Sequence, residues 1–191
     1  MVKARTVKTL IALLAAMTAG SLALVLMETA PVRPNITHLA AVAGPIDTFA
    51  SAISQTDYPI QAGQWRNIII YGEPAIRHAD QCHFVLAENA DPSGSGLRIT
   101  RLWREQSAGV HAFVGGHDYN ARSVAIYLTG DMTRRGPSGQ QVQAVIRLVR
   151  ALQQACEIPA ARVYLYRDLD PQSGSPGPQF PVGSLAAGLL D

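Results

Sequence analysis

The chain has 191 residues and a formal net charge of +2, and 48% of its residues are hydrophobic and 16% charged. This length allows one domain of ordinary size, and the apolar fraction is too high for a disordered chain. The 16 Gly and 12 Pro are scattered without a period, which excludes a collagen-like chain. Because the excess positive charge lies in the first 43 residues and the rest is close to neutral, we expect no nucleic-acid partner.

Residues 1–30 have the pattern of an export signal. Three cations, Lys3, Arg5 and Lys8, precede an uncharged Leu- and Ala-rich stretch from Thr9 to Met27, which is long enough to cross a bilayer as a helix. A removed signal peptide is the alternative, but Pro31 follows the apolar run and the better cleavage motif, Ala41-Val42-Ala43, lies well beyond it. We therefore favour an uncleaved membrane anchor.

The cations keep the N-terminus in the cytoplasm, so the rest of the chain is expected on the periplasmic or extracytoplasmic side of the cell membrane. Residues 31–45 are rich in Pro and Gly and are interpreted as a linker, and residues 46–191 as the domain. Cleavage of the signal would instead give a secreted protein. Export makes a disulfide between Cys82 and Cys156 possible; the alternative is two small buried hydrophobic side chains.

Hydrophobic periodicity predicts an α/β domain. Apolar spacing predicts a short helix from Ile46 to Ile53 and a long helix from Ser138 to Glu157, with Ser138 and Gln141 as a capping box. β-branched or alternating runs predict strands at residues 65–71, 83–86, 97–103, 123–128 and 162–166. Since a helix between two strands implies a crossover connection, we expect a mixed sheet flanked by helices.

Several of these segments, taken in order, resemble the zinc-dependent N-acetylmuramoyl-L-alanine amidases and the peptidoglycan recognition proteins. The run from Trp65 to Tyr71 resembles their first core strand, and His83-Phe84-Val85-Leu86 their "H-[FY]-x-[IL]" strand. The stretch from Gly109 to Ile126 is similar to their "G-x-H … H-N-x-x-S-[IV]-[GA]-[IV]" motif. Residues 165–169 and 175–180 are similar to their "G-H-R-D" and "P-G" segments. The resemblance implies a mainly parallel central sheet, preceded here by the N-terminal membrane helix.

The resemblance also implies where zinc would be held, and this chain departs from it. The family uses two histidines and a cysteine or aspartate, but the corresponding positions are Tyr71 (or Gly72, if the alignment slips by one), Tyr166 and Ser175. Neutral hydroxyl groups are poor zinc ligands beside imidazole and thiolate. The acidic and basic helper positions correspond to Tyr127 and Ser173. We therefore expect no zinc cofactor and no catalytic residue, as in a pseudoenzyme.

A displaced metal site is the alternative. His111 and His117 lie in one segment with Gly115-Gly116 between them to allow a tight turn, and Asp118 adds an oxygen ligand. With zinc held there, the chain would be an active amidase that hydrolyses the bond between N-acetylmuramic acid and L-alanine in peptidoglycan catabolism.

The resemblance implies a groove over the sheet that binds the muramyl-peptide stem. Aromatic faces and hydroxyl groups suit binding without reaction. The expected binding residues are Tyr71, His111, His117, Asn120, Tyr127 and Tyr166. The leading hypothesis is thus an exported, membrane-tethered amidase-like domain that binds peptidoglycan or muropeptides without zinc. A third hypothesis is a structural or interaction module in which the tyrosines close the cleft.

Overall fold

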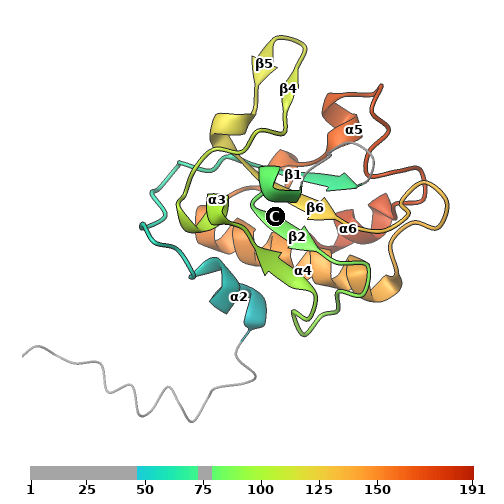
Figure 1. The fold of residues 1–191 in the computed structure, drawn as a ribbon, viewed down its shortest axis with the longest axis horizontal. Helices are drawn as coiled ribbons and strands as arrows, with labels where there is room; N and C mark the ends of the chain where they lie inside the picture. Colours follow the sequence, from blue (N-terminus) through green and yellow to red (C-terminus); the bar gives the residue numbers. More distant parts are fainter. Residues whose placement is uncertain (1–46, 73–78) are drawn as a thin grey trace, which may run out of the picture. The chain divides into compact units, whose positions relative to one another are not determined.

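The computed structural model describes residues 47–72 and 79–191 (Figure 1). The anchor and linker predicted over residues 1–45 lie outside these ranges. Within the two described ranges, no helix is both long enough and apolar enough to cross a membrane.

A five-stranded sheet, in the order β3-β2-β6-β1-β7, forms the centre of the domain. β2 pairs with β3 in antiparallel fashion, and the other three pairings are parallel. The predicted mixed, mainly parallel α/β fold is therefore confirmed. The strands are β1 (Asn67–Gly72), β2 (Phe84–Leu86), β3 (Leu97–Ile99), β6 (Ser123–Leu128) and β7 (Val163–Leu165).

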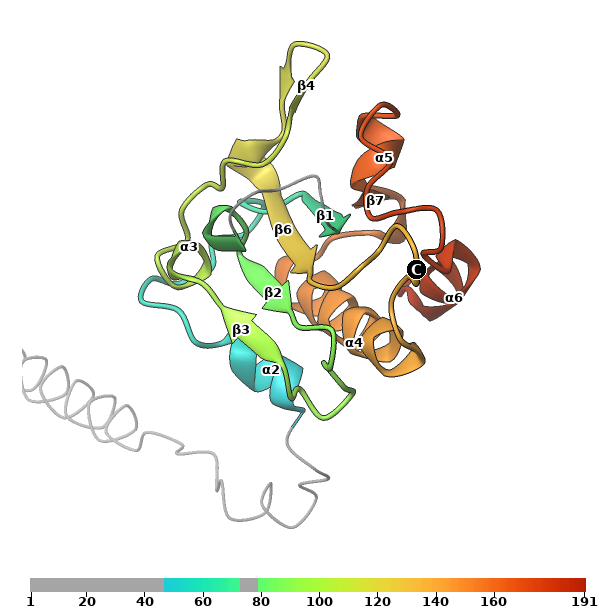
Figure 2. The same cartoon turned by 45° about the vertical axis from the view of Figure 1, so that its right-hand side comes forward.

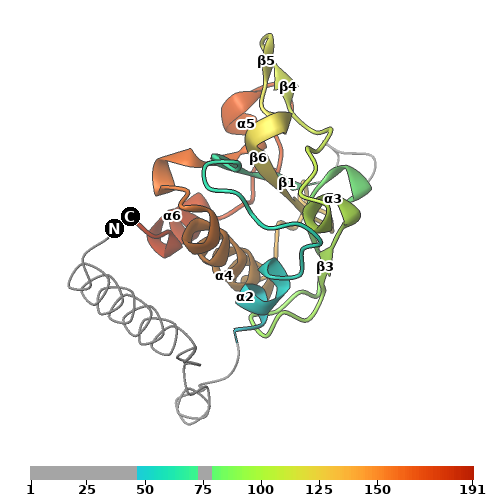
Figure 3. The same ribbon diagram turned by 90° about the vertical axis from the view of Figure 1, so that its left-hand side faces the viewer.

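Side chains alternate between the two faces of this sheet, as the pleat requires. Ile68 and Ile70 of β1 belong to the larger core cluster, whereas Ile69 and Tyr71 belong to a smaller one. Three helices, α2 (Thr48–Ile53), α4 (Gly139–Cys156) and α6 (Val182–Gly188), contribute buried residues to the larger cluster. Figure 3 shows them on one side of the sheet. We call this side the helical face and the other the Tyr71 face.

The long helix begins and ends close to the predicted positions. The Ser138 hydroxyl caps α4 by accepting a hydrogen bond from the Gln141 N–H at 3.1 Å. The Gln141 side chain does not complete the predicted capping box. Its amide donates instead to three carbonyls at the ends of β2 and β6, those of Leu86, Ala87 and Thr129. This contact joins the start of α4 to the edge of the sheet where the parallel strands end.

The predicted strand over residues 97–103 is wrong in its second half. β3 ends at Ile99, and a short helix, α3 (Arg101–Arg104), follows. Thr100 is buried and bonds through its hydroxyl to the Cys82 carbonyl and through its N–H to the His83 carbonyl. After this turn Trp103 is buried and donates its indole N–H to the Ile53 carbonyl at 3.1 Å. Tertiary hydrogen bonds thus overrule the alternating pattern.

Other connections were not predicted. A hairpin of β4 (Phe113–Val114) and β5 (His117–Asp118) projects beyond the sheet (Figure 2). The last predicted strand ends at Leu165, because Tyr166 starts the short helix α5 (Tyr166–Leu169). Short 3-10 turns cover Ala79–Gln81, Asn120–Arg122 and Ala160–Arg162.

Cys82 and Cys156 are both free and buried. Cys82 belongs to the cluster on the Tyr71 face and Cys156 to the cluster on the helical face. Burial raises the pKa of the Cys156 thiol to about 12 and that of Cys82 well above its ordinary value. Both cysteines therefore act as small buried hydrophobic side chains in this structure.

Candidate functional site

Three tyrosines at positions that the resemblance assigns to the family's metal ligands and acidic helper lie at the same end of the sheet. Tyr71 lies near the C-terminal end of β1, and Tyr127 lies opposite it on the neighbouring parallel strand β6. Tyr166 directly follows β7, which pairs with the other side of β1. Ligand sites in α/β folds lie where parallel strands end, so this is the expected place for a site.

Tyr71 is completely buried, and its hydroxyl group is hydrogen-bonded to a neighbouring side chain. A hydrogen bond of 2.8 Å joins its Oη to Nδ1 of His111. Its ring lies 4.7 Å from that of Tyr166, centroid to centroid, and 5.4 Å from that of His111. Burial raises the pKa of Tyr71 far above its ordinary value, so the phenol stays protonated. Tyr71 therefore contacts two neighbouring side chains, those of His111 and Tyr166.

Ser175 is also committed to contacts within the protein. It is 1% exposed, and its hydroxyl accepts a hydrogen bond from the Gly72 N–H at 2.9 Å and donates one to the Gly72 carbonyl at 3.0 Å. Ser173, the position of the basic helper, accepts a bond from the Ser175 N–H at 3.3 Å. These contacts hold the loop before Pro176 against the end of β1.

Asn120 positions the segment that carries His111. Its side-chain oxygen accepts hydrogen bonds from the N–H groups of His111 at 2.7 Å and Ala112 at 2.8 Å. The Tyr119 N–H donates to the Ala112 carbonyl at 3.0 Å, just below the β4–β5 hairpin. Gly115 and Gly116 have φ of +57° and +82°, so the tight turn predicted at these glycines is present. His117, on β5, is exposed.

His83 is buried in the core. Its Nδ1 accepts a hydrogen bond from the Ala125 N–H at 3.0 Å, and its Nε2 donates to the Ser107 carbonyl at 3.0 Å. The His111 ring lies 5.9 Å from the His83 ring, and the His111 Nε2 is buried without a hydrogen-bond partner among the described residues. Burial lowers the pKa of His83 to about 4 and is the main reason that the pKa of His111 falls to about 3.

Comparisons with known proteins agree with this fold. The family profile described as N-acetylmuramoyl-L-alanine amidase matches residues 41–178, which is most of the chain. The chain belongs to this family. No curated protein sequence matches it significantly.

Solved structures of amidases share the fold at low sequence identity. The amidase LysC from Clostridium intestinale URNW has a TM-score of 0.52 and 18% identity, over 69% of this chain and 94% of its own. The amidase AmiD from E. coli, solved with the substrate anhydro-N-acetylmuramic acid-L-Ala-D-gamma-Glu-L-Lys, has a TM-score of 0.53 and 22% identity, over 69% of this chain and 60% of its own. AmpD has a TM-score of 0.51 and 13% identity, over 72% of this chain and 96% of its own.

The side chains at the three positions that the resemblance assigns to the family's zinc ligands are poor ligands for that ion. Tyr71 is a protonated phenol, Tyr166 is a second tyrosine, and the Ser175 hydroxyl makes two hydrogen bonds to the Gly72 backbone. Within residues 47–72 and 79–191, no group of three or more His, Cys, Asp or Glu side chains is placed to hold a metal ion. His111, His117 and Asp118 therefore do not form the trio that a displaced site needs.

Sequence reasoning missed the role of Gly109 in this amidase-family site. A Cβ atom at Gly109 would lie 2.2 Å from Cδ2 and 2.6 Å from Nε2 of His111, and 2.8 Å from the Gln81 carbonyl oxygen. The "G-x-H" spacing is the signal for it, because only glycine leaves room for the imidazole that bonds to Tyr71.

We expect Gly109→Ala to lower the free energy of unfolding by about 1–3 kcal/mol, because the added methyl group overpacks the His111 ring. Urea unfolding measures this. Gly183→Ala is the control, since a Cβ at Gly183 in α6 meets nothing within 4 Å. The control should leave stability unchanged or raise it by up to about 1 kcal/mol. Equal effects of the two substitutions would show that the His111 ring is not held against Gly109.

The lowered pKa values of His83 and His111 predict a loss of stability in mild acid. Their pKa values in the folded chain, about 4 and about 3, lie below the ordinary 6.5, so the unfolded chain takes up protons first. The free energy of unfolding should therefore fall as pH drops below 6.5, by about 1.4 kcal/mol per pH unit for each group. Urea unfolding between pH 7 and pH 5 tests this in a range above most carboxylate titrations.

The exposed His117 supplies the control for this measurement, since His117→Gln should leave the pH slope unchanged. A stability that stays flat from pH 7 to pH 5 would contradict the lowered pKa values of His83 and His111 in the folded chain.

Proposed function

We propose that this domain binds peptidoglycan or muropeptides on the Tyr71 face of its sheet and does not hydrolyse them through zinc. The family membership supports this class of ligand. AmiD, which shares the fold, was solved with a muropeptide substrate. The proposed lack of zinc hydrolysis is supported by two sets of hydrogen bonds. The Tyr71 hydroxyl bonds to His111, and the Ser175 hydroxyl bonds to Gly72.

Within this face, partly exposed residues make the proposed contacts. Tyr71 and Tyr127 are 0% and 5% exposed, so we assign them to the floor of the site. Tyr166 packs on Tyr71 and is partly exposed, which leaves part of its ring free for a sugar or peptide group. His117 is exposed on the hairpin, and the partly exposed Asn120 lies next to the segment that carries His111.

We further propose that residues 1–30 tether the domain to the cell membrane on its extracytoplasmic side. The basic N-terminus and the apolar run after it support this orientation. Cell fractionation of the full chain, with a deletion of residues 1–30 as the comparison, tests it. Recovery of the full chain in the soluble cytoplasmic fraction would contradict the proposal.

Co-sedimentation with purified cell-wall sacculi tests binding. We expect the protein to be retained, and Tyr166→Ala to reduce retention several-fold because the ring that packs on Tyr71 is lost. Tyr58→Ala removes another exposed tyrosine, 61% exposed and outside the Tyr71 face, and should have no effect. Retention no greater than that of an unrelated protein of similar charge would reject binding.

Metal analysis and a digestion assay decide between the remaining alternatives. Stoichiometric zinc together with release of peptide from sacculi would establish an active amidase and reject the proposal. Absence of both binding and zinc would favour a structural module with a closed site. The contact between the Tyr71 and Tyr166 rings is the specific observation in favour of that module.

A further inference from the structure

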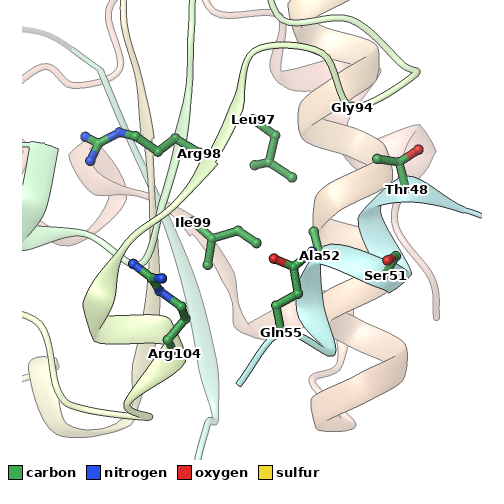
Figure 4. Close-up of a pocket in the computed structure, with 9 residues that line it drawn as sticks. All are labelled: Thr48, Ser51, Ala52, Gln55, Gly94, Leu97, Arg98, Ile99 and Arg104. Carbon is green, nitrogen blue, oxygen red and sulfur yellow. The ribbon is translucent and has the colours of Figure 1, made fainter. Parts of the chain in front are cut away.

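A pocket of about 400 Å³ lies between α2 and the edge strand β3. Its floor is apolar and consists of Ala52, Leu97 and Ile99, and Leu97 and Ile99 pack against the core cluster of the helical face. Figure 4 shows the side chains of Leu97 and Ile99 pointing toward α2. This groove is therefore separate from the Tyr71 face, and a ligand bound in it would be independent of the function proposed there.

The rim of the groove is polar and positively charged. Hydroxyl and amide groups come from Thr48, Ser51 and Gln55, on α2 and just after it, and Arg104 supplies a guanidinium group. Arg98 also lines the groove, but its side chain points away from α2 (Figure 4). Of the residues that the structure describes, no Asp or Glu lines the groove. Arg98 pairs with Asp80 at 2.9 Å, whereas Arg104 forms no ion pair among the described residues. A groove with unpaired positive charge attracts an anionic group.

One side of the groove is the open edge of the sheet. β3 is the last strand in the sheet, and no other described strand pairs with its outer side. Arg98 lies opposite Val85. On one side of this pair the Ala87 N–H donates to the Gly96 carbonyl, and on the other side the Thr100 N–H donates to the His83 carbonyl. Because backbone groups alternate along a strand, the Leu97 carbonyl and the Ile99 N–H point away from β2. Such an edge can accept an additional strand.

Close packing fixes one end of the groove. Gly94 has φ of +91°, and a Cβ atom there would lie 2.6 Å from Cγ2 of Thr48. The loop that precedes β3 is thus in direct contact with α2. The groove is a preformed feature of the fold, which lowers the entropic cost of binding an extended chain.

We infer that the α2–β3 groove binds an extended peptide segment that carries acidic side chains. The segment adds to the edge of β3 through the Leu97 carbonyl and the Ile99 N–H. Its apolar side chains lie on Leu97, Ile99 and Ala52, and a carboxylate meets Arg104. The partner is therefore a protein with an exposed, acidic and extended segment.

Fluorescence anisotropy with a labelled Val-Glu-Val-Glu-Val-Glu peptide and the full-length protein in mild detergent tests this inference. We expect saturable binding at micromolar protein, and a loss of affinity of about tenfold or more in Arg104→Glu, because the charge that meets the carboxylate is reversed. Arg162→Glu makes the same change at an exposed position outside the groove and should bind like the unchanged protein. Ser51→Tyr, which fills the groove from the exposed side of α2, should also weaken binding about tenfold.

Two further peptides separate the parts of the inference. A peptide of the same sequence that is N-methylated at alternate residues cannot pair with a strand edge, and should bind at least tenfold more weakly. The corresponding Val-Lys peptide should not bind. Equal binding of the N-methylated peptide would overturn strand addition. Equal binding of the Val-Lys peptide, or full affinity in Arg104→Glu, would overturn the role of the groove's positive charge.

Discussion

The combined variant Tyr71→His, Tyr166→His and Ser175→Cys should purify with about one zinc ion per chain, whereas the unchanged protein should carry almost none. The three positions are already adjacent. The Tyr71 and Tyr166 rings are 4.7 Å apart, and Ser175 bonds to Gly72, the residue after Tyr71. Two imidazoles and a thiolate are a common zinc ligand set, and metal analysis after dialysis against micromolar zinc measures the gain.

The control is the combined variant Tyr71→Phe, Tyr166→Phe and Ser175→Ala, which removes the same hydroxyl groups and supplies no ligand. It should bind no zinc. One zinc ion in the unchanged protein would show that the present residues hold a metal and would reject the proposed loss of zinc. A folded His/His/Cys variant without zinc would show instead that these are not the equivalent positions, and would direct attention to Gly72.

The strands and the long helix were predictable because their patterns are local. β1 and β6 are continuous apolar runs that are buried on both faces, which is typical of central parallel strands. α4 combines an apolar stripe with a Ser cap. α3 was not predictable, because the turn that ends the alternation of Leu97 and Ile99 is fixed by Thr100 through bonds to residues distant in the sequence.

The convergence of Tyr71, Tyr166 and Ser175 was predictable from the sequence, but their contacts were not. The family motifs bring Tyr71, Tyr166 and Ser175 to one edge of the sheet, and the parallel strands place them there. The sequence does not reveal that the Tyr71 hydroxyl bonds to His111, which lies 40 residues away. It also suggests that Tyr71 faces a ligand, whereas the structure buries it completely.

The contacts of His111 in the structure also differ from those that the sequence suggests. In the sequence it is a candidate metal ligand beside His117, since the two share a short segment with a glycine turn. In the structure the hairpin exposes His117, whereas His111 packs between Tyr71 and His83. The His111 ring contacts the Tyr71 ring and bonds to its hydroxyl, so it contributes to the packing of the Tyr71 face.

Asn120→Ala should lower the free energy of unfolding by about 2–4 kcal/mol, because two N–H groups lose their acceptor at once. These are the N–H groups of His111 and Ala112, which donate to Oδ1 at 2.7 and 2.8 Å. Without them, the segment below the β4–β5 hairpin is released and the His111 ring loses its position against Tyr71. Urea unfolding measures the stability, and hydrogen exchange of the backbone amides around residues 111–119 measures the local release.

Asn120→Asp distinguishes the loss of the acceptor from a general effect of substitution. Aspartate keeps an oxygen at the same place, and a carboxylate accepts from N–H groups at least as well as an amide does. Its charge lies near Asp118, whose Oδ1 accepts from the residue 120 N–H at 2.8 Å, so a cost of up to about 1 kcal/mol is expected from repulsion. If alanine and aspartate destabilise the chain equally, the two hydrogen bonds do not hold the segment. Slow exchange at residues 111–119 in Asn120→Ala would lead to the same conclusion, because the segment would then be held by the hairpin itself.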